Sequence, residues 1–365
     1  MKNRLEGRIL NNKKLLCSVG EKYVLYAKGK LYLSDIDGTD ERLLVALQGK
    51  MLKKILCKFR LMERFARLEP RLATELNEHE FLLSYQGMIA RINIDGTMTI
   101  EHKYRPTMNN PISFCVYGER IFYGEYFGNF NHEEVSIYER LPQGGWEKRY
   151  TFAAGMVQHI HQICFDEFRN CFWIMTGDKD DESAIWRASM DFSNVEPIFK
   201  GKQKYRSCFI MPSEKGIAYS TDTPLESNGI FVSEELEDGG WTEPVKQFEM
   251  PGPCIYGKKL RDGNYVMATS VEPDASLPPF QYYLSGKLGK GVRDRYSAIV
   301  YGRPDGSFME IAKYKKDPYK MWLFQFGNII FPNIREDDRV ICTGQSLKGI
   351  DGKTLEIRIK ENSEA

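Results

Sequence analysis

The feature that most constrains the fold is a hairpin unit that recurs at intervals of just under 50 residues. In each unit a short apolar run ends in a small residue and a polar or acidic one, and a second apolar strand then leads into a tight turn. The turns contain Asp-Gly, Gly-Gly or Ser-Asn pairs, which accept the positive φ that short hairpins require. They begin near Asp37, Asp95, Gly144, Asp191 and Asp238. Four short strands in such a period are typical of one propeller blade.

The repeat therefore predicts an all-β fold, a single β-propeller over residues 1–365 with about seven four-stranded blades. Six blades, or another meander of hairpins such as a β-sandwich, are the alternatives. The strands of a blade are named A to D, with A nearest the axis. The last unit lacks a fourth strand, and we expect the N-terminal segment RLEGRIL (4–10) to supply it and close the ring. Closure would leave no open sheet edge.

Three of the turns share a further pattern. Residues 34–39 read Ser-Asp-Ile-Asp-Gly-Thr, and degenerate copies occupy 93–97 and 189–193. These segments resemble the Asp-box, or BNR repeat, of sialidase-like propellers, in which the box is a structural turn between strands C and D. The resemblance implies the propeller fold but not sialidase activity, because neither the FRIP motif nor an arginine triad accompanies the boxes.

Strand order determines which loops share a face of the disc. Because the strands of a blade run antiparallel, the B-to-C and D-to-A connections lie on one face, here named the insertion face, and the other turns lie opposite. Polar residues at the starts of strands A and the ends of strands B should meet on the insertion face near the axis. They are Asn110, Glu125, Tyr126, His159, His161, Asp178, Tyr205, Arg206 and Asp222. Convergent polar groups of this kind are a candidate functional site.

The clearest signal is the pair His159 and His161, because alternate residues of a strand point to the same side. We expect four residues to act as catalytic acids and bases: His159, His161, Asp178 and Glu125. Five more are expected to bind substrate: Arg206, Asp222, Tyr126, Tyr205 and Asn110. No cofactor is expected, and a divalent metal held by the two histidines is the alternative. A second alternative for Arg206 is an interblade salt bridge to Asp178 or Asp222.

Two insertions belong to the insertion face. Residues 273–295 combine Pro, Gly and a Tyr pair, which predicts an ordered lid or binding loop. Residues 47–69 form a basic amphipathic insertion, with six net positive charges between residues 50 and 71. We expect it to be helical and to pack an apolar side on the propeller, namely Leu52, Ile55, Phe59 and Met62. Peripheral contact with an anionic membrane is the alternative.

The composition narrows the possible functions. Lys plus Arg total 51 and Asp plus Glu total 50, and no P-loop or dinucleotide fingerprint occurs, so no nucleic-acid or nucleotide partner is expected. The N-terminus has no apolar run and the eight Cys form no CxxC pair, which favours a cytoplasmic location. The leading hypothesis is a carbohydrate-active enzyme, a glycoside hydrolase or polysaccharide lyase, acting on an acidic oligosaccharide. The alternative is a non-catalytic scaffold that binds a glycan, a protein or a membrane-associated partner.

Overall fold

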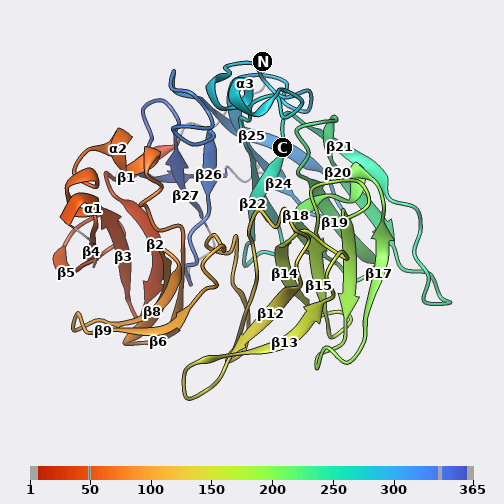
Figure 1. Cartoon of the computed structure of the whole chain (residues 1–365), viewed down its shortest axis with the longest axis horizontal. Helices are drawn as coiled ribbons and strands as arrows, with labels where there is room; N and C mark the ends of the chain where they lie inside the picture. Colours follow the sequence, from red (N-terminus) through yellow and green to blue (C-terminus); the bar gives the residue numbers. More distant parts are fainter. Residues whose placement is uncertain (1–6, 48, 50, 336–338, 360–365) are drawn as a thin grey trace, which may run out of the picture.

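The computed structural model describes residues 7–47, 49, 51–335 and 339–359. Its strands form seven four-stranded antiparallel sheets arranged around a ring (Figure 1). The chain is thus a seven-bladed β-propeller, which confirms the fold predicted from the repeat and excludes both the six-bladed ring and the sandwich. Within the described ranges, no helix has the length and apolar character needed to cross a bilayer.

The first three blades follow the chain in order. Blade 1 comprises β2 (Lys14–Val19), β3 (Lys22–Ala27), β4 (Lys30–Ser34) and β5 (Arg42–Ala46). Blade 2 comprises β6 (Leu72–Asn77), β7 (Glu80–Tyr85), β8 (Met88–Asn93) and β9 (Met98–Lys103). Blade 3 comprises β10 (Cys115–Tyr117), β11 (Arg120–Gly124), β12 (Val135–Arg140) and β13 (Trp146–Phe152).

The next three blades repeat this order. Blade 4 comprises β14 (Ile160–Asp166), β15 (Cys171–Thr176), β16 (Ala184–Ala188) and β17 (Val195–Lys200). A single 3-10 turn, η1 (Gln203–Tyr205), leads to blade 5, which comprises β18 (Ser207–Pro212), β19 (Gly216–Thr221), β20 (Asn228–Glu234) and β21 (Val245–Met250). Blade 6 comprises β22 (Cys254–Lys259), β23 (Tyr265–Thr269), β24 (Tyr296–Gly302) and β25 (Phe308–Lys315).

Blade 7 is built from both ends of the chain. It comprises β26 (Asn328–Ile330), β27 (Val340–Gln345), β28 (Thr354–Ile357) and, as its outer strand, β1 (Arg8–Asn11). β1 pairs antiparallel with β28, with Arg8 opposite Glu356 and Ile9 opposite Leu355. The predicted closure of the ring by an N-terminal strand is therefore confirmed.

The hydrophobic core lies between neighbouring blades. Middle strands such as β15 are buried along their whole length, whereas outer strands such as β21 are mostly exposed. One cluster joins Leu82 of blade 2, Phe122 of blade 3 and Phe172 of blade 4. Near the axis the blades crowd together, and a Cβ on Gly124 would lie 2.3 Å from the side chain of Ile160. Only glycine fits there, because packed interiors leave no space for an added methyl group.

The Asp-box-like segments are turns, as expected. They connect strands C and D of blades 1, 2 and 4, on the face opposite the insertions. In the first, Asp37 Oδ1 accepts hydrogen bonds from Thr39 N (3.0 Å) and Thr39 Oγ1 (2.8 Å). These side chains close a turn and do not reach the axis, so they serve the fold.

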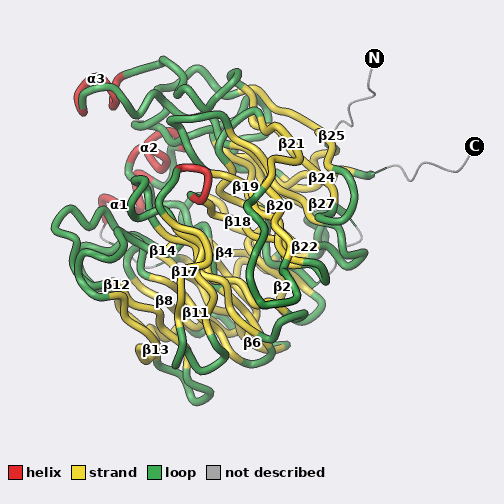
Figure 2. Tube along the Cα trace, turned by 90° about the vertical axis from the view of Figure 1, so that its right-hand side faces the viewer, coloured by secondary structure: helices red, strands yellow, loops and turns green. Residues whose placement is uncertain are grey.

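Three short helices rise from the insertion face: α1 (Met51–Leu56), α2 (Arg60–Phe65) and α3 (Pro279–Leu284). Figure 2 shows them on the same side of the molecule. The insertion at 47–69 is thus partly helical, but the expected packing of its apolar side is wrong. Leu52 is 67% exposed and Phe59 is 60% exposed, and Ile55 and Met62 are exposed as well.

The charged side of these helices packs on the body instead. Arg64 is 1% exposed, and its Nη1 lies 2.6 Å from Asp317 Oδ2. Arg60 pairs with Asp351 at 2.8 Å and with Glu63 at 3.0 Å. The loops beneath offer carboxylates, and covering them with apolar side chains would leave buried charges unpaired, which costs several kcal/mol. Ion pairing therefore decides the orientation that the hydrophobic spacing alone predicted wrongly.

Candidate functional site

The polar cluster lies where blades 3, 4 and 5 meet on the insertion face. His159 and His161 stand at the start of β14, Asp178 follows β15, and Asp222 follows β19. The structure brings these together with Arg206, which precedes β18, and with Tyr126, which follows β11. The centroid of the Tyr126 ring is 4.5 Å from that of His159. Strand ends of adjacent blades thus place six of the nine predicted site residues in one cluster.

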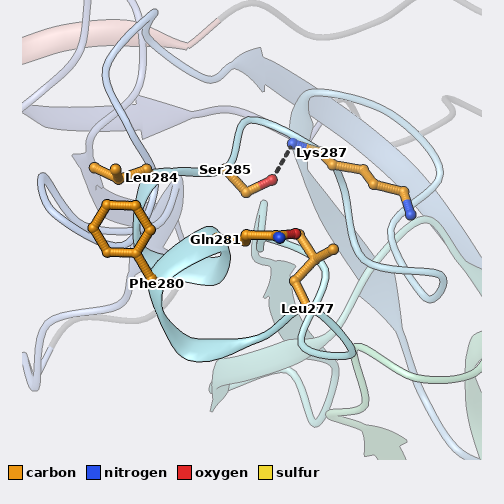
Figure 3. A pocket seen from close by; sticks show the side chains of 6 residues that line it. All are labelled: Leu277, Phe280, Gln281, Leu284, Ser285 and Lys287. Atoms are coloured by element: carbon orange, nitrogen blue, oxygen red, sulfur yellow. Dashed lines mark hydrogen bonds between the residues drawn. The ribbon is translucent and has the colours of Figure 1, made fainter.

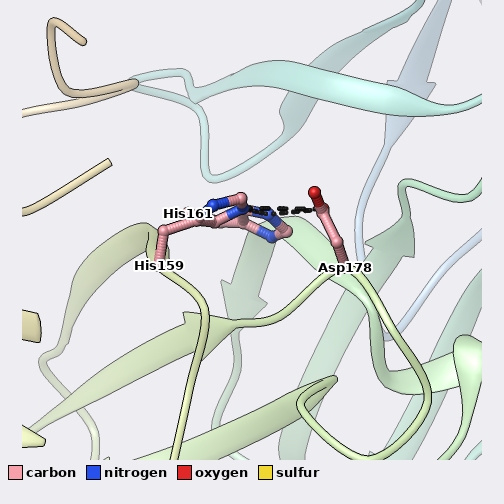
Figure 4. A group of neighbouring side chains, drawn as sticks. All are labelled: His159, His161 and Asp178. Carbon is pink, nitrogen blue, oxygen red and sulfur yellow. Dashed lines mark hydrogen bonds and ion pairs between the residues drawn. The ribbon is translucent and has the colours of Figure 1, made fainter. Parts of the chain in front are cut away.

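The two imidazoles have a defined hydrogen-bonding state. His159 Nδ1 lies 3.0 Å from the carbonyl oxygen of Phe127, and His161 Nδ1 lies 3.0 Å from that of Ser207. A carbonyl only accepts, so each Nδ1 carries the hydrogen and each neutral ring has a lone pair on Nε2. The two Nε2 atoms are 2.9 Å apart, and Asp178 Oδ1 lies 3.5 Å from the first and 3.3 Å from the second (Figure 4). Three acceptor atoms therefore converge on one point.

Asp178 also meets a guanidinium. Arg206 Nη2 is 2.9 Å from Asp178 Oδ1 and 3.7 Å from Asp222 Oδ2, so the interblade salt bridge considered for this arginine is formed. Burial by itself would raise the pKa of Asp178, but the Arg206 guanidinium holds it well below its usual range. Burial lowers the pKa of His161, against the opposing effect of Asp178. The imidazoles are buried while Asp178 is 33% exposed, so solvent reaches the cluster at this carboxylate.

Cys208 extends the cluster and was not predicted. Its Sγ lies 3.2 Å from Asp222 Oδ2, and with His161 the three residues form a second possible ligand set. Burial and the charge of Asp222 raise the pKa of the thiol well above its usual value, so it stays protonated. The set with Cys208 is buried throughout, whereas Asp178 is partly exposed, so His159, His161 and Asp178 form the set that solvent and a substrate can reach. The sequence did contain a signal for Cys208: it lies two residues after Arg206, and alternate residues of a strand point to the same side.

Blade 6 and its insertion contribute two further residues close to the cluster. The Ser270 hydroxyl donates to Glu272 Oε1, and burial, reinforced by Asp222, raises the pKa of Glu272 to about 8. Tyr282 of α3 has its pKa raised by burial and by the charges of Glu272 and Asp178. The 273–295 insertion thus brings an aromatic side chain within electrostatic range of the cluster. The Tyr pair in its sequence indicated a binding loop but not the position of these side chains.

Glu125, a predicted catalytic residue, lies in a different environment. Its Oε1 is 3.1 Å from Arg105 Nε, and its Oε2 accepts a hydrogen bond from Ser136 N at 2.8 Å. The next residue, Tyr126, faces His159. Because neighbouring residues at a strand end point in opposite directions, Glu125 and Tyr126 cannot both face the imidazoles.

Tyr205 and Asn110 also lie outside the cluster. Tyr205 belongs to η1, where its hydroxyl donates to Glu243 at 3.1 Å and its ring stacks on Phe199 of an outer strand. Asn110 Oδ1 lies 3.3 Å from Ser84 Oγ of blade 2. The sequence analysis predicted that Tyr205 lies at the start of strand A. Tyr205 instead belongs to the 3-10 turn, which directs its side chain toward the outer strand.

A pocket of about 410 Å³ lies beside α3 (Figure 3). It is lined by Leu277, Phe280, Gln281, Leu284, Ser285 and Lys287. Of these only Lys287 is ionisable, and its backbone N donates to Ser285 Oγ at 2.8 Å. Its described lining residues include no pair of acid and base groups.

No protein-family model matches the sequence, and comparison with curated proteins gives no match. Among solved structures, the AfRom2 CNH domain aligns with 98% of this chain and 99% of its own, at 8% identity and a TM-score of 0.55. An extracellular domain from B. thetaiotaomicron, assigned to a hybrid two component system, aligns with 96% of this chain and 38% of its own, at 10% identity and a TM-score of 0.53. A gluconolactonase from Xanthomonas campestris aligns with 98% of this chain and 91% of its own, at 11% identity and a TM-score of 0.43. At these identities the likeness concerns the fold alone, and it agrees with a seven-bladed β-propeller.

Proposed function

We propose that the cluster binds a divalent cation, Zn²⁺ fitting best, in the active site of an enzyme that cleaves an acidic glycan. The observation that carries this proposal is the convergence of His159 Nε2, His161 Nε2 and Asp178 Oδ1. Three acceptors around one point repel one another, and a divalent cation between them would bind all three. Two imidazoles and one carboxylate with access to solvent are the pattern of catalytic zinc sites, which keep an open position.

The surroundings of the three ligands support the same assignment. Metal-bound histidines commonly donate their other ring N–H to a backbone carbonyl, as both do here. Arg206 holds the remaining ligand, Asp178, at 2.9 Å. A metal at this point would polarise a substrate oxygen or activate water. The two histidine–carbonyl hydrogen bonds fix the orientation of both imidazole rings in the metal-free protein.

The neighbouring residues have the chemistry needed to bind and cleave a sugar chain. Glu272, with its pKa raised to about 8, holds a proton near neutral pH and is suited to general acid catalysis. Tyr126 and Tyr282 offer aromatic faces to a sugar ring. Arg206 and the exposed Arg67, which lies within electrostatic range of Tyr282, favour a substrate that carries carboxylates. Hydrolysis and β-elimination both remain compatible with this set.

Metal binding is the first test. Zn²⁺ titrated into metal-free protein should bind at about one equivalent, and His161→Ala should weaken binding by at least about a hundredfold, since it removes a ligand. His79→Ala is the matched control, because His79 is exposed on blade 2 and should leave binding unchanged. Absence of Zn²⁺ binding by the wild-type protein would contradict the proposal.

Turnover is the second test. Uronate-containing oligosaccharides incubated with the Zn²⁺-loaded protein should be shortened, and His161→Ala should abolish this while the melting temperature of the metal-free protein changes by only a few degrees. An unsaturated product identifies elimination, and a saturated one identifies hydrolysis. Zn²⁺ binding without cleavage or binding of any acidic oligosaccharide would leave the metal site standing and remove the glycan assignment.

A further inference from the structure

We propose that the insertion face docks on an anionic lipid membrane, with a phospholipid headgroup held in a pocket beside α1. The proposal is independent of the active-site chemistry, because it rests on other residues. It begins from the packing of segment 47–69, whose apolar side faces away from the propeller.

The pocket measures about 550 Å³ and lies between the β3–β4 turn and α1. Five of its lining residues are lysines: Lys28, Lys30, Lys53, Lys54 and Lys58. None of the described residues that line it is acidic. Lys53 Nζ donates to Gln86 Oε1 at 2.5 Å, and the described residues place no carboxylate within salt-bridge distance of the other four lysines. Five lysines among the lining residues favour an anionic occupant.

Apolar side chains project beside this pocket. On α1 and its end, Met51 is 79% exposed and Leu52 is 67% exposed, and on the following segment Phe59 is 60% exposed. Phe65 of α2 is exposed too, and its ring lies 5.9 Å from that of Phe324. Exposed apolar groups of this size at adjacent positions mark an interaction surface.

The exposed groups continue across the insertion face. The ring of Trp322 packs at a tilt against that of Tyr283 in the 273–295 insertion, with 4.1 Å between ring centroids, and Arg67 lies over the same Trp322 ring, which links the α2 side to α3. Phe280 on α3 is 75% exposed, and Phe130 in the B-to-C loop of blade 3 is 92% exposed. Figure 2 shows α1, α2 and α3 projecting on one side. Exposed apolar side chains therefore occur on the insertion-face connections of several blades.

This distribution fits a lipid surface better than a folded protein. Phe59 and Phe65 lie in segment 47–69, whereas Phe280 lies in the insertion of blade 6 and Phe130 in the B-to-C loop of blade 3, so the exposed rings are spread over three connections. A fluid bilayer accepts separate apolar side chains at its headgroup boundary, and neighbouring lysines attract its anionic lipids. Charge and apolar exposure therefore point to the same occupant, an anionic phospholipid with its acyl region under Phe59 and its headgroup among the lysines.

The test is co-sedimentation with vesicles. The full chain should bind vesicles of phosphatidylcholine containing phosphatidylserine, bind pure phosphatidylcholine at least tenfold more weakly, and lose affinity as salt is raised. Lys54→Glu/Lys58→Glu should weaken binding at least tenfold, because both side chains are exposed and their reversal leaves the fold intact. Phe59→Ser should weaken it several-fold without changing the salt dependence.

Lys215→Glu/Arg261→Glu is the matched control. It makes the same change in net charge at exposed turns of the opposite face and should bind like the wild type. Equal loss in this control, equal binding to neutral vesicles, or no vesicle binding at all would overturn the proposal. So would tight binding of inositol hexakisphosphate without binding to vesicles, which would indicate a site for a free anion.

Discussion

Glu272 is a carboxyl group whose ionisation the fold opposes. Burial and the nearby charge of Asp222 raise its pKa to about 8, while its partner Ser270 supplies a hydrogen bond. An unfolded glutamate has a pKa of about 4.3. Between these two values the folded protein retains a proton that the unfolded chain has released.

The free energy of unfolding should therefore fall as pH rises through this interval, by up to about 1.4 kcal/mol per pH unit, and level off once pH exceeds the folded pKa. Glu272→Gln keeps the shape and removes the titration, so its stability should be flatter between about pH 5 and pH 8. Urea denaturation of both proteins across this range measures the difference. An identical slope in the two proteins would show that Glu272 ionises normally.

The site could be predicted in part because strand order determines which ends of which strands converge. This reasoning brought His159, His161 and Asp178 to one place. It failed for Glu125 and Tyr205, because it located backbone positions and not the direction of each side chain. The two Nε2 lone pairs face each other because the Nδ1 atoms donate to the carbonyls of Phe127 and Ser207. No sequence pattern indicates which carbonyl a histidine will contact.

At the scale of elements, α1 and α2 show that helical spacing alone does not identify the buried side. Both sides of segment 47–69 have a regular pattern. The apolar side was predicted to pack, but Arg60 and Arg64 instead meet the carboxylates of Asp351 and Asp317 from distant loops. Those partners lie more than 200 residues away in the chain, so a local pattern could not reveal them.

Arg64→Ala should consequently destabilise the protein by about 3 kcal/mol, because it leaves Asp317 with a weaker set of partners in a buried position. Phe59→Ala, on the apolar side of the same segment, should change the free energy of unfolding by less than about 0.5 kcal/mol. Chemical denaturation of the two variants compares them directly. The reverse order of effects would mean that the apolar side packs on the body.

For the whole molecule, the closing blade joins the two ends of the chain. β1 covers the edge of β28, and an uncovered edge exposes a row of unpaired backbone groups that can pair with another copy. A variant lacking residues 1–11 should therefore melt several degrees lower and form oligomers on size-exclusion chromatography. A monomer of unchanged melting temperature would show that β1 adds nothing to closure.

The position of β1 also orders events during synthesis. β1 precedes every other strand of the ring and its partner β28 follows them all, so blades 1 to 6 can form from neighbouring hairpins while blade 7 must wait until β28 has been made. Contacts that close long loops form slowly, because the chain loses conformational entropy before the stabilising contacts are made. The short outer strand joins last, and the same blade is where we expect the native ring to open first.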